Sequence, residues 1–157
     1  MKIDKSWYIK PKDTDFPVSV SAGGVVIREE KGVIKIALLK TNEFKDYSLP
    51  KGTYEKGETV EQTAIREIQE ETGLQNIKLI RKLGVKERYS YKKTVWKTTH
   101  YFLFITKDIS GVQNLQPDEG NLQLEWFDIN KLPLIFWPEQ TELIEENREK
   151  IKLAFFG

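Results

Sequence analysis

Runs of apolar and β-branched residues separated by turn signals predict several strands along the chain. The first run contains the pair Gly23-Gly24, which marks either a bulge or a close approach of another part of the backbone. A turn at Lys31-Gly32 separates it from the second run, and Lys92-Lys93 joins two longer runs into an expected β-hairpin. Strands are thus expected over residues 18–28, 34–40, 77–91, 95–107 and 122–128.

Two segments show the periodicity of amphipathic helices. The first is well delimited, because Thr59 is a good N-cap, Gln62 completes a capping box, and Gly73 stands at the usual position of a C-terminal glycine. Its apolar stripe consists of Val60, Ala64 and Ile68. The second, over residues 138–155, begins with Pro138 and interleaves glutamates with aliphatic residues. Strands interleaved with two helices make a mixed α/β domain the expected fold class.

Length and composition restrict the class of protein. With 157 residues, we expect a single domain over residues 1–157, with an N-terminal extension over residues 1–17. The chain contains no cysteine, which excludes disulfides, thiolate metal sites and cysteine nucleophiles, and His100 is the only histidine, which excludes zinc sites built from several histidines. No apolar run approaches the roughly 18–20 residues that span a bilayer, and the charged N-terminus lacks the apolar centre of a secretory signal. We therefore expect a cytoplasmic protein with no membrane partner.

Charge is balanced overall and uneven along the chain. The formal net charge of +1 argues against a protein built to hold nucleic acid stably. Residues 81–100 contain seven lysines and arginines and one acid, whereas residues 139–149 contain five glutamates and one arginine. Each run is interpreted as a solvated face, or, for the basic run with its tyrosines and Trp96, as a surface for a base with phosphates attached.

Three glutamates, Glu67, Glu70 and Glu71, crowd the second half of the first helix. They lie about one turn apart, near the negative end of the helix dipole, and no cation stands at the i+4 positions of Glu67 or Glu70. Such repulsion costs about a few tenths of a kcal/mol per pair, so an exposed acidic helix end is one interpretation. The other is a divalent cation among the carboxylates, and oxygen ligands of this kind suit Mg²⁺.

The loop before this helix partly matches a known phosphate-binding pattern. Gly52 and Gly57 have the spacing of the phosphate-binding pattern GxxxxGK[ST], but Glu58 occupies the lysine position. A carboxylate there repels the phosphates that such a loop has to hold. That interpretation fails, and what remains is a glycine-rich loop that delivers an acid toward the same carboxylates.

Loop and helix together resemble a known motif. Gly52, five residues, Glu58, seven residues and then residues 66–74 match the Nudix box GX5EX7REUXEEXGU, with U a bulky aliphatic residue, at every specified position. The chain is thereby identified as a member of the Nudix hydrolase family on residues 52–74. The resemblance implies the family's α/β/α sandwich with a mixed β-sheet. It also implies hydrolysis of a nucleoside diphosphate linked to another group, with Mg²⁺ or Mn²⁺ bound by the box.

The resemblance assigns roles to individual residues. The metal ligands that it implies are Glu67, Glu70, Glu71 and the backbone carbonyl of Lys51. Glu70 is alternatively an acid that positions the catalytic base. Glu58 supports the metal site through hydrogen bonds, and Arg66 orients the glutamates. The family's catalytic base is often a glutamate in the loop before the last strand, which here is Glu119 in residues 116–120, with Glu125 as its rival.

The substrate is implied less directly. Residues 49–52 and 101–104 are similar to the subgroup that hydrolyses dinucleoside polyphosphates, such as diadenosine tetraphosphate, or RNA 5′ ends, although Thr53 replaces the histidine usual there. Substrate-binding residues by this resemblance are Lys51, Tyr91, Lys93 and Tyr101, with Lys92 and Lys97 of the matching kind. Phe136 and Trp137 either roof the nucleotide site or anchor the terminal helix.

Other activities remain open on the same scaffold. They are cleansing of nucleoside triphosphates, cleavage of a nucleotide sugar, and pyrophosphohydrolysis at RNA 5′ ends. A non-catalytic nucleotide-binding module is less favoured, because such modules commonly lose box glutamates and this chain has kept them all. Both a monomer and a homodimer are compatible with the sequence.

Overall fold

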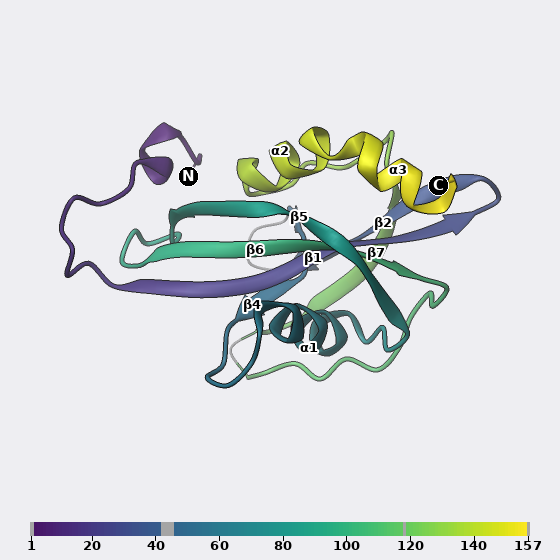
Figure 1. The fold of residues 1–157 in the computed structure, drawn as a ribbon, viewed down its shortest axis with the longest axis horizontal. Helices are drawn as coiled ribbons and strands as arrows, with labels where there is room; N and C mark the ends of the chain where they lie inside the picture. The colour runs from purple at the N-terminus through teal and green to yellow at the C-terminus, as the bar shows by residue number, and fades with distance from the viewer. Residues whose placement is uncertain (1, 42–45, 118, 157) are drawn as a thin grey trace.

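A mixed β-sheet lies between helices on its two faces. The computed structural model describes residues 2–41, 46–117 and 119–156, so Asp118 in the expected loop over residues 116–120 lies outside the described residues. The elements are η1 (Lys5–Tyr8), β1 (Val18–Glu30), β2 (Val33–Thr41), β3 (Tyr47–Ser48), β4 (Lys51–Thr53), α1 (Val60–Thr72), β5 (Ile77–Tyr89), β6 (Trp96–Thr106), β7 (Leu122–Asp128), α2 (Pro138–Glu146) and α3 (Arg148–Phe156). Helix α1 covers one face and the α2–α3 pair covers the other (Figure 1). The expected α/β/α sandwich is confirmed.

Strand β1 is the centre of the sheet. It pairs in parallel with β6 and antiparallel with β2 and β4, while β5 pairs antiparallel with β6 at one edge. Strands β3 and β7 both pair antiparallel with β2. The expected hairpin is therefore present as β5 and β6, which close at the pair Tyr89 and Trp96.

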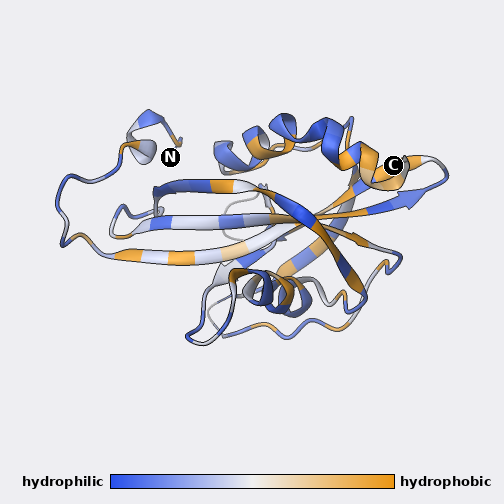
Figure 2. Cartoon of the chain, viewed as in Figure 1, coloured by the Kyte–Doolittle hydropathy of each residue, from blue (hydrophilic) through white to orange (hydrophobic). Residues whose placement is uncertain are grey.

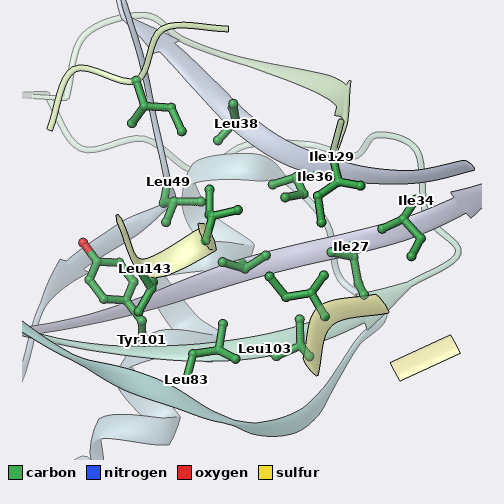
Figure 3. Packing of buried hydrophobic residues seen from close by; sticks show 14 residues of the cluster. Ile27, Ile34, Ile36, Leu38, Leu49, Leu83, Tyr101, Leu103, Ile129 and Leu143 are labelled. Atoms are coloured by element: carbon green, nitrogen blue, oxygen red, sulfur yellow. The ribbon is translucent and has the colours of Figure 1, made fainter. Parts of the chain in front are cut away.

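Apolar side chains form one core layer on each face of the sheet. The layer under α2 and α3 includes Tyr101, whose side chain lies among aliphatic residues of β1, β2 and α2 (Figure 3). The layer under α1 includes Ala64 and Ile68, two members of the predicted apolar stripe. In Figure 2 the helices α1 and α2 are amphipathic, with hydrophobic residues toward the sheet. Among the residues that the structure describes, none of the helices combines the length and apolar character needed to cross a bilayer.

Helix α1 begins and ends where its local sequence predicts. The Thr59 side chain accepts the Gln62 amide, and the Gln62 side chain accepts the Thr59 amide, so the capping box is complete. Gly73 adopts the left-handed conformation at φ 80°, and its amide donates to the carbonyl of Gln69. The helix that carries the box glutamates is therefore fixed at both ends.

The single helix expected over residues 138–155 is instead two helices. Helix α2 ends at Glu146, α3 begins at Arg148, and Asn147 lies between them with φ −111° and ψ 12°. The buried Asn147 side-chain amide donates to the carbonyl of Leu143 at 2.8 Å. Asparagine side chains compete with helical backbone bonds in this way, a local effect that the amphipathic pattern alone does not reveal.

The glycine pair in β1 marks a close approach of the backbone. A Cβ atom on Gly23 would lie 2.1 Å from the carbonyl oxygen of Pro50, and one on Gly24 would lie 2.3 Å from that of Phe102. The Gly24 amide donates to the Pro50 carbonyl at 3.1 Å. Gly23 thus lets residues 50–51, directly before the Nudix box, lie against the central strand, and Gly24 allows the close approach of β6.

Candidate active site

Helix α1 and the loop before β7 bring three carboxylates together, which we call the acid cluster (Glu67, Glu71 and Glu119). One carboxylate oxygen from each lies within 4.8 Å of the other two. Glu67 and Glu71 are one helical turn apart, so their side chains share a face of α1. The third predicted helix acid, Glu70, is not part of this group, and its Oε2 lies 3.5 Å from Nη1 of Arg66, the atom that also bonds to Glu67. The structure therefore joins Glu119, rather than Glu70, to the other two acids.

The two helix members of the acid cluster are buried, and Glu119 is partly buried. Glu67 is 9% exposed and Glu71 is 8% exposed. Burial raises the pKa of both carboxyls, that of Glu71 well above its usual range, and for Glu71 the neighbouring Glu119 acts in the same direction. The Lys51 amide donates to Oε1 of Glu71 at 2.9 Å. Buried carboxylates that repel one another fit a hard divalent cation, because oxygen atoms are the ligands that Mg²⁺ prefers.

Arg66 organises the acids beside the cluster. Its Nε and Nη2 donate to the two oxygens of Glu58 at 2.7 and 2.9 Å, and its Nη1 donates to Oε1 of Glu67 at 2.7 Å. Hydrogen bonds from Arg66, and a further one from Thr63, lower the pKa of Glu58 to about 2. Arg66 and Glu58 thus form a bidentate pair that aims the guanidinium at Glu67, as the family resemblance implies.

Gly52, the first residue of the Nudix box, has a steric role that the motif alone does not reveal. A Cβ atom at Gly52 would lie 2.0 Å from the carboxyl carbon of Glu67. Only a residue without a side chain leaves room there for the carboxylate. Gly52 therefore permits β4 to pass directly over the acid cluster.

Two cavities of about 310 and 370 Å³ adjoin the cluster and share Lys51, Glu71 and Glu119. The smaller one is lined by the box loop and also contains Glu67. The larger one extends away from the acids and reaches Lys97 and two aromatic residues, Phe136 and Trp137, which we call the aromatic wall. Acids, cations and aromatic rings therefore line two adjoining cavities that form one depression.

The two lysines of the larger cavity lie in an unfavourable environment for a cation. Burial lowers the pKa of Lys51 to about 8, and the positive charges of Arg88 and Lys97 contribute to the shift. Burial and Arg88 also lower the pKa of Lys97. An anionic ligand between these lysines relieves that repulsion, so the cavity is suited to a phosphate chain.

The predicted substrate-binding residues are not all in this depression. Lys51 lines both cavities, and the ring of Tyr91 lies 5.9 Å from that of Phe136, beside the aromatic wall. Tyr101, however, is fully buried in the core, where its hydroxyl accepts a hydrogen bond from Gln140. Lys93 lies over the ring of Trp7 and donates to Ser6. Neither of these two residues lines a cavity that contains the acid cluster.

The two glutamates considered as the catalytic base, Glu119 and Glu125, lie in different surroundings. Glu125 accepts a hydrogen bond from the Tyr47 hydroxyl at 2.9 Å. Glu119 lies in the acid cluster and accepts the Gln116 amide at 2.7 Å. Glu119 is the one of the two that lines the depression.

Comparisons with known proteins agree with this geometry. Residues 18–147 match the NUDIX domain. The chain is 34% identical to an ADP-ribose pyrophosphatase of Methanocaldococcus jannaschii over 134 residues, which is 84% of this chain and 75% of that protein. It is 29% identical to an RNA pyrophosphohydrolase of Bartonella clarridgeiae over 127 residues, which is 69% of this chain and 73% of that protein.

The fold is likewise similar to a solved structure. A Caenorhabditis elegans Ap4A hydrolase, in a binary complex, superposes with a TM-score of 0.69 at 23% identity, covering 85% of this chain and 98% of that chain. At this identity the similarity concerns the fold. The family match covers most of the chain and includes the whole box. The chain therefore belongs to the Nudix family and is, like its members, a hydrolase of nucleotide pyrophosphate bonds.

Proposed function

We propose that this chain hydrolyses a phosphoanhydride bond of a nucleoside polyphosphate in a Mg²⁺-dependent reaction. The observation that carries the proposal is the depression formed by the two adjoining cavities. It is lined by the acid cluster, by Lys51 and Lys97, and by the aromatic wall. A nucleotide has the complementary order of parts, with the reacting phosphates at one end and a planar base at the other.

The residues that would hold Mg²⁺ are Glu67 and Glu71, with the backbone carbonyl of Lys51 as the further ligand that the Nudix resemblance implies. Their oxygens are hard donors, and the two side chains already face the same point. When bound, Mg²⁺ neutralises charge on the phosphate oxygens and lowers the pKa of water. Arg66 keeps Glu67 in place through its hydrogen bond, and Glu58 fixes Arg66.

Glu119 is proposed as the general base. Its Oε1 accepts the Gln116 amide, so the carboxylate is oriented by its own loop, and in this role it accepts the proton of the attacking water. Glu125 is bonded to Tyr47 outside the acid cluster. Lys51 and Lys97 bind the phosphate chain, and the aromatic wall stacks on the base.

Dinucleoside polyphosphates, such as diadenosine tetraphosphate, are the substrates we propose first. The sequence similarity at residues 49–52 supports them, and the fold similarity to an Ap4A hydrolase is consistent with them. ADP-ribose is the second candidate, because a relative that is 34% identical carries that activity in its name. Both substrates present a diphosphate linkage attached to adenosine.

Product identity from a mixed substrate panel tests the proposal. The panel contains diadenosine tetraphosphate, ADP-ribose, nucleoside triphosphates and 5′-triphosphorylated RNA, each incubated with Mg²⁺ and separated by chromatography. Diadenosine tetraphosphate is expected to give AMP and ATP, whereas ADP-ribose gives AMP and ribose 5-phosphate. A nucleoside triphosphate gives a monophosphate and pyrophosphate, so each candidate substrate has its own product pair.

A matched control separates catalysis from binding. The Glu71→Gln variant removes one carboxylate charge and keeps an oxygen that accepts the Lys51 amide. It is expected to lose turnover on every member of the panel. Binding of a nucleotide without turnover by the unchanged chain, with Mg²⁺ and with Mn²⁺, would contradict the proposal and favour a non-catalytic nucleotide-binding module.

A further inference from the structure

The N-terminal segment packs against the outside of the larger cavity. Helix η1 lies outside the region that matches the NUDIX domain. Its residue Trp7 is 4% exposed, with the ammonium of Lys93 at 4.0 Å from the centre of the ring. Figure 1 shows this helix near the beginning of α2 and the end of β5. The segment is therefore docked on the hairpin and on α2.

A chain of contacts runs from this segment to the aromatic wall. The Tyr8 hydroxyl donates to Oε1 of Glu139 at 2.6 Å, and Nε of Arg88 donates to Oε2 of the same carboxylate at 2.6 Å. The guanidinium carbon of Arg88 lies 3.2 Å from the centre of the Trp137 ring. Arg88, Glu139 and Trp137 are 4%, 5% and 8% exposed. The contacts are continuous, the bond from Arg88 is buried and that from Tyr8 is partly buried, and each oxygen of Glu139 accepts from one of these two donors.

We propose that Tyr8 is a positioning residue for the nucleoside part of the substrate and that it acts through Glu139 and Arg88 on Trp137. The inference rests on the proposed function, in which the aromatic wall stacks on the base. The guanidinium is held in one plane because Nε bonds to Glu139 and Nη1 bonds to the carbonyl of Tyr89 at 3.0 Å. Stacked on one face of the indole in that plane, the guanidinium fixes the position of the ring where it lines the cavity.

The two phosphate-binding lysines belong to other elements, and Tyr8→Phe keeps the charges of Arg88 and Glu139 that act on them. Lys51 belongs to β4 and Lys97 to β6, and the Lys51 amide is bonded to Glu71. Tyr8 and Arg88 do not line the cavity themselves, whereas Trp137 does. Loss of the Tyr8 hydroxyl should therefore weaken binding of the nucleoside part of a ligand and have little effect on binding of its phosphates.

The test compares two ligands that share their phosphonate groups and differ by adenosine. These are α,β-methylene-ADP and methylenediphosphonate, titrated by calorimetry with Mg²⁺ into the full-length chain. We expect Tyr8→Phe to weaken the binding of α,β-methylene-ADP about five-fold and that of methylenediphosphonate less than about two-fold, because one buried hydrogen bond to a charged group is lost. Thermal unfolding of the same samples verifies that the variant is folded.

Tyr89→Phe is the matched control. It removes a hydroxyl at the end of β5, from the residue next to Arg88. Among the described residues that hydroxyl makes no hydrogen bond to a side chain. Its affinity for both ligands should equal that of the unchanged chain. A second comparison introduces Tyr8→Phe into Trp137→Leu, where it should have no further effect, because the indole through which Tyr8 acts is absent.

Three results would overturn the inference. They are equal weakening of both ligands by Tyr8→Phe, an undiminished effect of Tyr8→Phe in the Trp137→Leu background, and equal affinity of the unchanged chain for the two ligands. The titrations do not depend on turnover, since neither ligand contains a P–O–P bond. A chain that binds adenosine through Trp137 and hydrolyses nothing would refute the proposed function while retaining this inference.

Discussion

Two buried groups of charges flank Lys51, and they are built in opposite ways. On one side, Glu71 and Glu119 of the acid cluster have no ion pair among the described residues, because Arg66 is engaged by Glu58 and Glu67. On the other side, Arg88 and Glu139 form a pair with Nε and Oε2 2.6 Å apart. Charges from both groups act on Lys51: Arg88 lowers its pKa, whereas Glu71 and Glu139 raise it.

The difference between the groups indicates what each is for. A buried pair with its hydrogen bonds satisfied needs nothing from solution, and it holds neighbouring groups in place. Buried carboxylates that repel one another are costly to the folded chain until a cation joins them. We therefore propose that the acid cluster is the part of the molecule that binds a ligand and that the Arg88–Glu139 pair supports the cavity.

The largest effect is expected from Glu71→Gln in the acid cluster. It should lower kcat about 1,000-fold, or about 4 kcal/mol of transition-state stabilisation, because a metal-binding charge is lost. Thermal stability without metal should be unchanged or higher, because a buried repulsive charge is removed. Steady-state kinetics and thermal unfolding measure the two quantities. A stability loss that parallels the activity loss would contradict this interpretation of the acid cluster.

Breaking the opposite group should affect stability first. Arg88→Met leaves Glu139 buried with only the Tyr8 hydroxyl as a partner, and we expect the free energy of unfolding to fall by about 3 kcal/mol. The double variant Arg88→Met/Glu139→Gln removes the unpaired charge and should recover at least half of that loss. Urea unfolding of the two variants measures the difference. If the double variant is no more stable than the single one, burial of the charge is not the cause.

Sequence alone predicts the local parts of the site. The limits of α1 follow from Thr59, Gln62 and Gly73, which act within one helix, and the box spacing indicates the acids of that helix. Helical periodicity does not distinguish Glu70 from Glu67 and Glu71, since all three are neighbours at i, i+3 and i+4. Their separation depends on where Arg66 lies once the loop has folded back.

The remaining parts depend on contacts between distant segments. Arg88 and Glu139 are 51 residues apart, and no local signal pairs them. Tyr101 was predicted to bind substrate because it is aromatic and follows a basic strand, but the alternation of faces along β6 places it in the core. For Trp137 the sequence left two roles open, a roof of the nucleotide site or an anchor of the terminal helix, and its ring both lines the cavity and contacts Arg88.

Two glutamates on the acid side provide the next comparison. Glu119 lies in the acid cluster, whereas Glu70 lies against Arg66. We expect Glu119→Gln to lower kcat about 100-fold, as for loss of a general base, and Glu70→Gln to lower it about ten-fold or less. Steady-state kinetics of the two variants measure the difference. Equal losses in the two variants would return Glu70 to the role of metal ligand or base-positioning acid that the Nudix resemblance implies.

The smallest effect is expected from an ion pair at the surface that joins the same two elements as the Arg88–Glu139 pair. Lys86 of β5 lies 2.7 Å from Glu142 and 2.5 Å from Glu146 of α2, and these two acids have side chains that are 65% and 54% exposed. Lys86→Met should change the free energy of unfolding by less than about 1 kcal/mol, and 1 M NaCl should abolish the change, because exposed pairs are weak and screened by salt. Urea unfolding with and without salt measures it beside Arg88→Met. Since both substitutions cut a link between β5 and α2, equal costs would show that burial does not distinguish the two pairs.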